Sequence, residues 1–196
     1  MADDETLAFY ARNAAEYVRD DGGRPDARLH AFLDALPAGA RILELGSGSG
    51  RDAATMLERG FDVHATDASP ELAAEAEVRL GRPVAIMRFD ELDAQAAYDG
   101  VWACACLLHA PAEELTDDLR RIHAALRVGG LLTASFKAGN GAGRDRFGRY
   151  YNYPDRDTLL GHFHAAADWR GVELESNEGS GYDRQPTQWL WVNARK

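Results

Sequence analysis

The sequence has few cysteines and little basic charge. Its 196 residues include two cysteines, Cys104 and Cys106, both within one apolar segment. Two nearby thiols give no disulfide framework, so a reducing compartment is expected. With 22 basic and 32 acidic residues, the formal net charge is −10. This balance argues against nucleic acid as a partner, because affinity for phosphate backbones depends mainly on lysine and arginine.

Long hydrophobic runs are also missing. No apolar stretch approaches the roughly 20 residues that cross a bilayer. The N-terminal MADDETLAF lacks the basic and apolar regions of a secretory signal. We therefore expect a cytoplasmic protein with no membrane partner. The length suits a single domain over residues 1–196 with a substantial core, and it leaves monomer and homodimer open.

Predicted strands alternate with predicted helices through the middle of the chain. Two helices come first, over 6–20 and 26–36, with DGGRP between them. The alternation then predicts strands at 41–45, 62–66, 84–89, 98–108 and 129–137, and helices at 52–60, 69–81 and 111–126. This pattern is typical of βαβ units and a parallel sheet. After a helix at 155–166, strands at 171–178 and 187–195 are expected to pair antiparallel at the sheet edge.

A glycine-rich turn follows the first predicted strand, in RILELGSGSGRD (41–52). Gly46, Gly48 and Gly50 alternate there. Glycine accepts positive φ and lets a ligand approach the backbone closely. Ligands of open α/β sheets bind at the carboxyl ends of the strands, and one glycine would suffice for a plain turn. The three glycines therefore indicate a ligand site.

Asp67 ends the second predicted strand, 17 residues after Gly50. A carboxylate at this position can accept both ribose hydroxyls of a nucleoside cofactor. The alternative, that Asp67 caps the next helix, is weaker because Ser69 is better placed for that. A dinucleotide would require G-x-G-x-x-G and a helix N-terminus free of negative charge. Here the turn is G-x-G-x-G, and Glu44 and Asp52 flank it. These carboxylates suit a cofactor that carries an ammonium and a sulfonium.

The arrangement E-x-G-x-G-x-G, followed by an acid at the next strand end, resembles the class I S-adenosylmethionine-dependent methyltransferases. FDEL (89–92), YDGVW (98–102) and LRVGGLL (126–132) agree with later family segments. The resemblance implies a Rossmann-like α/β fold with a seven-stranded, mostly parallel sheet, helices on both faces and an antiparallel C-terminal hairpin. It implies that S-adenosyl-L-methionine is bound by Tyr17, Glu44, Gly46, Ser47, Gly48, Gly50, Arg51, Asp67, Ala68, Phe89, Asp90, Glu91 and Cys106.

GSGSGRDA (46–53) and FYARNAAEY (9–17) resemble small stand-alone members of that family, including the tellurite-resistance type. In such members an aromatic N-terminal helix folds over the cofactor. The resemblance implies a helical cap at residues 1–36 and makes Tyr10, Tyr17 and Arg51 possible cofactor contacts. Packing of both tyrosines onto the core is the open alternative.

Candidate chemistry centres on His109, which follows the fourth predicted strand. Methyl transfer depends mainly on positioning, and a base is needed only when the acceptor must lose a proton. His109 could serve as that base, or simply form a local hydrogen bond at a helix start. Cys104 and Cys106 are expected on one face of a strand as small buried residues. His162 and His164 diverge on a helix, so no metal site is expected.

The segment 138–156 is predicted to cover the acceptor. It is rich in glycine and then in tyrosine, and residues 137–156 carry five basic against two acidic side chains. Arg149, Tyr150 and Tyr153, with Arg184 from a later cluster, are candidate ligands for a small anionic or aromatic acceptor. A solvated mobile loop is the alternative. Two other functions stay open, an NAD(P)-dependent oxidoreductase and a catalytically inactive cofactor-binding module.

Overall fold

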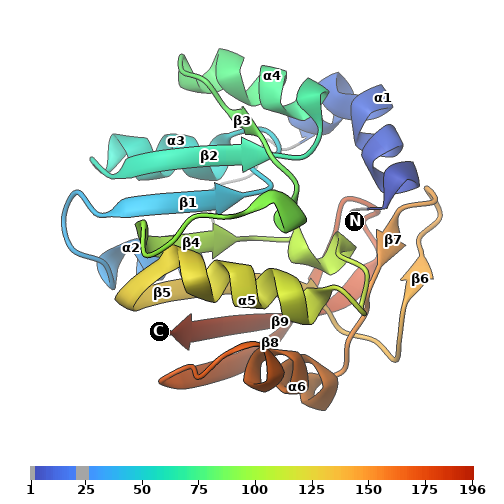
Figure 1. Ribbon diagram of the computed structural model, residues 1–196. Coiled ribbons are helices and arrows are strands. Elements are labelled where there is room, and N and C mark those ends of the chain that lie inside the picture. The colour runs from blue at the N-terminus through green and yellow to red at the C-terminus, as the bar shows by residue number, and fades with distance from the viewer. Residues whose placement is uncertain (1–2, 21–26) are drawn as a thin grey trace.

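A computed structural model describes residues 3–20 and 27–196, which form an α/β structure around one large sheet (Figure 1). The sheet has seven strands in the order β3-β2-β1-β4-β5-β9-β8. Strands β1 to β5 run parallel, and β9 is antiparallel to both of its neighbours. The strands are β1 (Arg41–Leu45), β2 (Asp62–Asp67), β3 (Ala85–Ile86), β4 (Tyr98–Ala103), β5 (Leu126–Lys137), β8 (Gly171–Ser180) and β9 (Pro186–Arg195). The predicted Rossmann-like sheet and C-terminal antiparallel pair are confirmed.

Helices cover both faces of the sheet. In Figure 1, α5 and α6 lie in front of the sheet, whereas α2 and α3 lie behind it. Helix α1 lies beside α4, at the end where β1, β2 and β4 terminate. The helices are α1 (Asp4–Asp20), α2 (Ala27–Asp34), α3 (Arg51–Glu58), α4 (Pro70–Leu80), α5 (Leu115–Ala125) and α6 (Arg156–Ala166), with short 3-10 helices η1 (Phe89–Glu91) and η2 (Leu107–His109).

The capping expected for α4 is present. Ser69 has an extended backbone, and its hydroxyl accepts a hydrogen bond from the amide nitrogen of Leu72 at 3.3 Å. Pro70 occupies the first helical position, where no intrahelical N–H is required. The helix ends at Gly81, whose φ of 62° is left-handed. These local rules fix the helix that leads away from Asp67.

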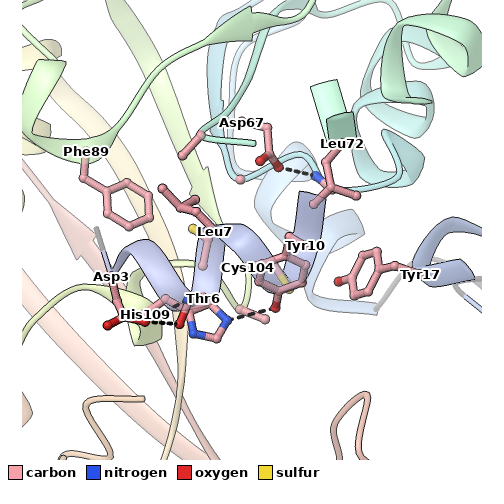
Figure 2. Close-up of a pocket in the computed structure, with 15 residues that line it drawn as sticks. Asp3, Thr6, Leu7, Tyr10, Tyr17, Asp67, Leu72, Phe89, Cys104 and His109 are labelled. Carbon is pink, nitrogen blue, oxygen red and sulfur yellow. Dashed lines mark hydrogen bonds between the residues drawn. The ribbon is translucent and has the colours of Figure 1, made fainter. Parts of the chain in front are cut away.

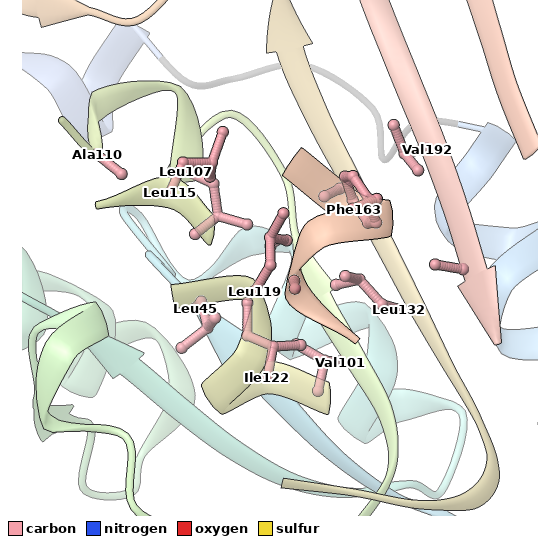
Figure 3. Packing of buried hydrophobic residues seen from close by; sticks show 14 of the residues in the cluster. Leu45, Val101, Leu107, Ala110, Leu115, Leu119, Ile122, Leu132, Phe163 and Val192 are labelled. Atoms are coloured by element: carbon pink, nitrogen blue, oxygen red, sulfur yellow. The ribbon is translucent and has the colours of Figure 1, made fainter. Parts of the chain in front are cut away.

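The main core lies between the sheet and the two front helices. Leu115, Leu119 and Ile122 recur at helical spacing on α5 and are at most 1% exposed. Figure 3 shows them packed beside Phe163 of α6 and against apolar side chains of the strands. On the other face, Phe32 of α2 packs on Trp102 with a ring-centroid distance of 5.3 Å. The sheet is therefore buried on both faces at its centre.

Several predicted boundaries differ from the structure. The third strand is two residues long rather than 84–89, and the fourth ends at Ala103 rather than at 108. Ala105 has a left-handed φ of 52°, which stops the strand and leads into η2. Cys104 and Cys106 therefore lie in a turn, and the expectation that they share a strand face is wrong. Helix α5 begins at Leu115, four residues later than predicted.

The segment 138–156 contains a hairpin that was not expected. Its strands are β6 (Gly143–Arg144) and β7 (Tyr150–Tyr151), which pair antiparallel. The two-residue strands give too short an alternation to be read from sequence. Over the described residues, no helix combines the length and apolar character needed to cross a bilayer.

Candidate cofactor and acceptor site

The turn after β1 adopts the backbone that its glycines permit. Gly46, Gly48 and Gly50 have φ values of 68°, 54° and 73°, all left-handed. A Cβ placed on Gly46 would lie 2.5 Å from the Cβ of Cys106. One on Gly50 would lie 3.1 Å from the Cβ of Ala76 in α4. Two of the glycines are thus required by close packing as well as by conformation.

Asp67 links this turn to the start of α4. The side chain is 93% buried, with a relative exposure of 7%. Its carboxylate accepts hydrogen bonds from the amide nitrogens of Gly48 and Ser69, both at 2.9 Å. Burial raises the pKa of Asp67, and the backbone N–H groups oppose that rise. Figure 2 shows the carboxylate at the pocket wall.

Two adjoining pockets open around the glycine turn. The main pocket measures about 620 Å³, including space open to solvent, and lies between the turn, α1, η1 and η2 (Figure 2). It is lined by Asp3, Thr6, Leu7, Tyr10, Tyr17, Gly46, Gly48, Asp67, Ala68, Leu72, Phe89, Cys104, Ala105, Cys106 and His109. The side pocket measures about 440 Å³ on the same basis and is lined by Tyr17, Glu44, Gly46, Ser47, Gly48, Ser49, Arg51, Asp52, Trp102, Cys104 and Ala105. The two pockets share Tyr17, Gly46, Gly48, Cys104 and Ala105, so they adjoin at the turn.

The side pocket contains a buried hydrogen-bond acceptor atom to which no group donates. Glu44 is 2% exposed, and its Oε2 atom has no hydrogen-bond partner. Burial, reinforced by the charge of Asp52, raises the pKa of Glu44 well above its usual range. Asp52 itself accepts a hydrogen bond from Trp102 Nε1 at 2.9 Å and one from Arg51 Nε at 3.1 Å. An unsatisfied carboxylate oxygen at this position suits a ligand that brings an ammonium group.

Replacing Glu44 by glutamine should affect the thermal stability of the protein and its affinity for the ligand in opposite directions. Folding favours the protonated carboxyl of Glu44, because the folded pKa is raised, and glutamine imitates that form at every pH. We therefore expect Glu44→Gln to melt at a higher temperature than wild type near neutral pH. The difference should shrink as pH falls toward the usual glutamate range. Affinity for an ammonium-bearing ligand should fall about tenfold or more, the loss of one charge-assisted hydrogen bond.

Thermal unfolding across a pH series and ligand titration at pH 7 measure these two effects. A variant that is less stable than wild type at neutral pH, or that binds equally well, would contradict this role for Glu44.

His109 lies at the main pocket in a fixed orientation. It is 91% buried, with a relative exposure of 9%. Its Nδ1 atom is 2.5 Å from the carbonyl oxygen of Tyr150, and its Nε2 atom is 2.9 Å from Tyr10 Oη. Burial lowers the pKa of His109 to about 4, and the nearby Arg149 adds to this effect. The imidazole is therefore neutral over the physiological pH range.

The structure places the four predicted acceptor ligands away from the lining of the main pocket. Arg149 is 1% exposed and forms an ion pair with Asp145 at 2.7 Å. Tyr150 contributes its carbonyl to His109, while its hydroxyl accepts from the amide nitrogen of Ala112 at 3.2 Å. Tyr153 stacks on Tyr151, with ring centroids 5.1 Å apart.

Arg184, the fourth, has a side chain that is 81% exposed and lies 3.6 Å from Asp20. The segment 138–156 thus does not line the main pocket, and it contacts the lining residue His109 through the Tyr150 carbonyl.

Most predicted cofactor residues border the two pockets. Those at the main pocket are Tyr17, Gly46, Gly48, Asp67, Ala68, Phe89 and Cys106, and those added by the side pocket are Glu44, Ser47 and Arg51. Gly50 does not line either pocket but caps α3. Asp90 and Glu91 belong to η1 and interact with Arg88, through its side chain and its backbone N–H respectively. All remain predictions as cofactor ligands.

Several lining residues were not predicted. Of the expected cap at 1–36, only α1 borders the main pocket, whereas α2 packs on the sheet, and residues 21–26 between them lie outside the described residues. Asp3, just before α1, and the α1 residues Thr6 and Leu7 carry no motif, although their helical spacing could have indicated a common face. Cys104 and Ala105 are exposed to both pockets by the turn that ends β4.

Comparisons with known proteins point to one class of domain. Residues 42–130 match a family described as "Methyltransferase domain". The uncharacterized methyltransferase Rv3342 of Mycobacterium tuberculosis is 39% identical over 66 residues, which cover 33% of this chain and 27% of that protein. The match thus spans about a quarter of the curated relative.

Solved structures share the fold over most of the chain. The 1,6-didemethyltoxoflavin-N1-methyltransferase of Burkholderia thailandensis, solved with 1,6-didemethyltoxoflavin and S-adenosylhomocysteine bound, aligns with a TM-score of 0.72 and 27% identity, covering 100% of this chain and 91% of that one. A SAM-dependent methyltransferase from Methanosarcina mazei aligns with a TM-score of 0.76 and 15% identity, covering 89% and 99% respectively. The second similarity concerns the fold alone.

Proposed function

We propose that this chain, which has the Rossmann-like fold of the class I methyltransferases, transfers a methyl group from S-adenosylmethionine to a small-molecule acceptor. The observation that carries the proposal is the side pocket, where the glycine turn adjoins the unsatisfied Oε2 of buried Glu44. The methyltransferase-domain match over residues 42–130 supports it. A tellurite-type subclass gains no support from the comparisons.

The residues present fit this cofactor. Asp67 has a carboxylate at the wall of the main pocket that can accept ribose hydroxyls. In the side pocket, the Asp52 carboxylate and the unpartnered Oε2 of Glu44 offer acceptors to an ammonium group. Phe89 and Leu72 offer apolar surface for a nucleobase. A dinucleotide fits less well, because its pyrophosphate would meet Asp52 at the start of α3.

The acceptor we expect is small and carries no negative charge. Two basic side chains of 138–156 are paired with carboxylates, Arg144 with Asp3 at 2.7 Å and the candidate ligand Arg149 with Asp145 at 2.7 Å. No lysine or arginine lines the main pocket as the described residues form it. An anion would therefore meet no basic side chain in the lining of the main pocket. This replaces the expectation of an anionic acceptor held by Arg149.

The chain's own residues would act mainly by positioning. When bound, the cofactor supplies an electrophilic methyl group on a sulfonium. The glycine turn and Asp67 hold the nucleoside end, and α1 covers the main pocket with Leu7, Tyr10 and Tyr17, which limits access of water. Proximity and orientation of donor and acceptor then provide much of the acceleration.

Titration with the competing cofactors tests the proposal. Calorimetry should show micromolar binding of S-adenosylmethionine and S-adenosylhomocysteine, and no heat from NAD⁺ or NADP⁺. Tight dinucleotide binding alone would establish the oxidoreductase alternative instead. If S-adenosylmethionine binds but no acceptor in a broad screen is methylated, the inactive binding module would be favoured.

A further inference from the structure

The buried guanidinium of Arg149 has unusual surroundings. Its side chain is 1% exposed, and both Nε and Nη2 donate to Asp145 Oδ2, at 3.0 and 2.7 Å. Five aromatic rings lie around its Cζ atom at centroid distances of 5.0 to 5.6 Å, those of Phe9, Tyr10, Phe147, Tyr151 and Tyr182. The ion pair satisfies the charge, and the rings fix the guanidinium plane.

A third nitrogen of the Arg149 guanidinium contacts a residue that lines the main pocket. Its Nη1 atom donates to Tyr10 Oη at 3.0 Å. Since a guanidinium has no acceptor, Tyr10 Oη must accept this bond and turn its own proton elsewhere. His109 Nε2 lies 2.9 Å from the same oxygen.

The tautomer of His109 follows from its other neighbour. The Tyr150 carbonyl, 2.5 Å from Nδ1, can only accept. Nδ1 therefore carries the proton, and Nε2 of the neutral ring presents a lone pair to the hydroxyl of Tyr10. The hydrogen bonds run in one direction, from Arg149 through Tyr10 and His109 to Tyr150.

Other contacts already dock α1 on this part of the protein. Arg144 Nη2 and Nη1 donate to Asp3 Oδ1 and Oδ2 at 2.7 and 3.0 Å, and the amide nitrogen of Tyr150 donates to Thr6 Oγ1 at 2.8 Å. The Tyr10 hydroxyl is not required to hold the helix. Because Nε2 is engaged by Tyr10, His109 cannot itself meet an acceptor in this arrangement.

We propose that Tyr10, rather than His109, is the catalytic residue that takes the acceptor's proton, with His109 as its proton sink and Arg149 as a positioning residue. The proposal rests on the methyltransferase function above. It names a substrate class, an uncharged acceptor whose N–H or O–H proton must be lost. Tyr10 lines the main pocket together with His109 (Figure 2).

The proton transfer balances within these groups. The acceptor's lone pair forms the bond to the methyl carbon, and the electron pair of the broken carbon–sulfur bond stays on sulfur. The acceptor's proton goes to Tyr10 Oη as the Tyr10 proton goes to His109 Nε2. Arg149 stabilises negative charge on Oη during the exchange. The imidazolium then releases its proton to solvent when product leaves.

The first test is nuclear magnetic resonance of ¹⁵N-histidine-labelled protein. The ionisable groups that face His109 are Tyr10 from α1, Asp145, Arg149 and Tyr151 from 138–156, and Lys137 from β5. We expect His109 to be neutral with Nδ1 protonated between pH 5 and 8, well above its pKa of about 4. Tyr10→Phe should shift the Nε2 resonance and raise the pKa of His109, because the hydroxyl that stabilises the neutral ring is lost.

Matched variants separate this role from packing. Tyr17 touches the Tyr10 ring at a centroid distance of 5.4 Å, and Tyr17→Phe should leave the His109 titration unchanged. Arg149→Lys keeps a cation beside Asp145 but loses the fixed donor to Tyr10, so it should also shift Nε2. A proton on Nε2 in wild type, or no response to Tyr10→Phe, would overturn the proposal even if S-adenosylmethionine binds.

Kinetics provides the second test. On any acceptor that wild type methylates, Tyr10→Phe should lower kcat about 10²–10⁴-fold with little change in cofactor KM. Unchanged kcat would overturn the base assignment. Absence of cofactor binding together with the expected His109 signals would instead refute the proposed function and leave the hydrogen-bond chain intact.

Discussion

Replacing Asp67 by alanine is expected to remove measurable S-adenosylmethionine binding. Two hydrogen bonds from ribose hydroxyls to a carboxylate are worth about 1.5–3 kcal/mol each, which corresponds to a loss of about 10²–10⁴-fold in affinity. The same substitution leaves the amide nitrogens of Gly48 and Ser69 without the acceptor that they have at 2.9 Å. The fold should therefore also lose stability, about 1–3 kcal/mol for each unsatisfied group.

Asp99 provides the matched control for Asp67. It also accepts a backbone hydrogen bond, from the amide nitrogen of Arg41 at 2.8 Å, and it pairs with Arg127 at 2.7 Å. It lies near the start of β4, whereas the pocket lies at the strand ends. Asp99→Ala should therefore reduce stability but leave cofactor affinity unchanged in calorimetry. If both variants bind equally well, Asp67 does not hold the ribose.

Gly46→Val is expected to have the second large effect. A left-handed φ of 68° costs an L-residue about 1–2 kcal/mol. The added Cβ would also lie 2.5 Å from Cys106 Cβ, and overpacking of this kind costs about 1–3 kcal/mol more. Relief of the clash requires the turn to move out of the shape that adjoins both pockets. Cofactor binding should therefore be lost even where the protein still folds.

Gly39 is a control position that separates the cost of a left-handed backbone from the cost of a steric clash. Its φ of 69° matches that of Gly46, but nothing lies within 4 Å of its Cβ position. In chemical denaturation, Gly39→Val should lower the free energy of unfolding only by the cost of the left-handed backbone. It should bind S-adenosylmethionine normally. Equal destabilisation of the two variants, or normal binding by Gly46→Val, would show that contact with Cys106 does not shape the pocket.

The sheet and the glycine turn were predictable because their causes are local. Apolar strands such as Arg41–Leu45 alternate with capped helices such as Pro70–Leu80, and each rule acts within a few residues. The same is true of Gly46 and Asp67, which follow and end two consecutive strands that pair directly in the parallel sheet. The sequence therefore indicated the glycine turn and Asp67, both of which the structure places at the main pocket.

The acceptor side could not be predicted in the same way. The sequence predicts Arg149 as a substrate ligand, because arginine beside tyrosines suits an anionic or aromatic acceptor. Its partners Tyr10 and Tyr182 come from distant parts of the chain, and only the folded arrangement shows that Asp145 neutralises it. Ion pairs between segment 138–156 and the N-terminal region depend on the tertiary structure, so the spacing of residues in the sequence does not predict them.

A crystal structure with S-adenosylhomocysteine tests the central claim most directly. We expect the ribose hydroxyls within hydrogen-bond distance of Asp67 and the amino group beside Oε2 of Glu44, the buried oxygen that has no partner without ligand. A nucleoside bound elsewhere, with Asp67 still engaged only by Gly48 and Ser69, would contradict the account.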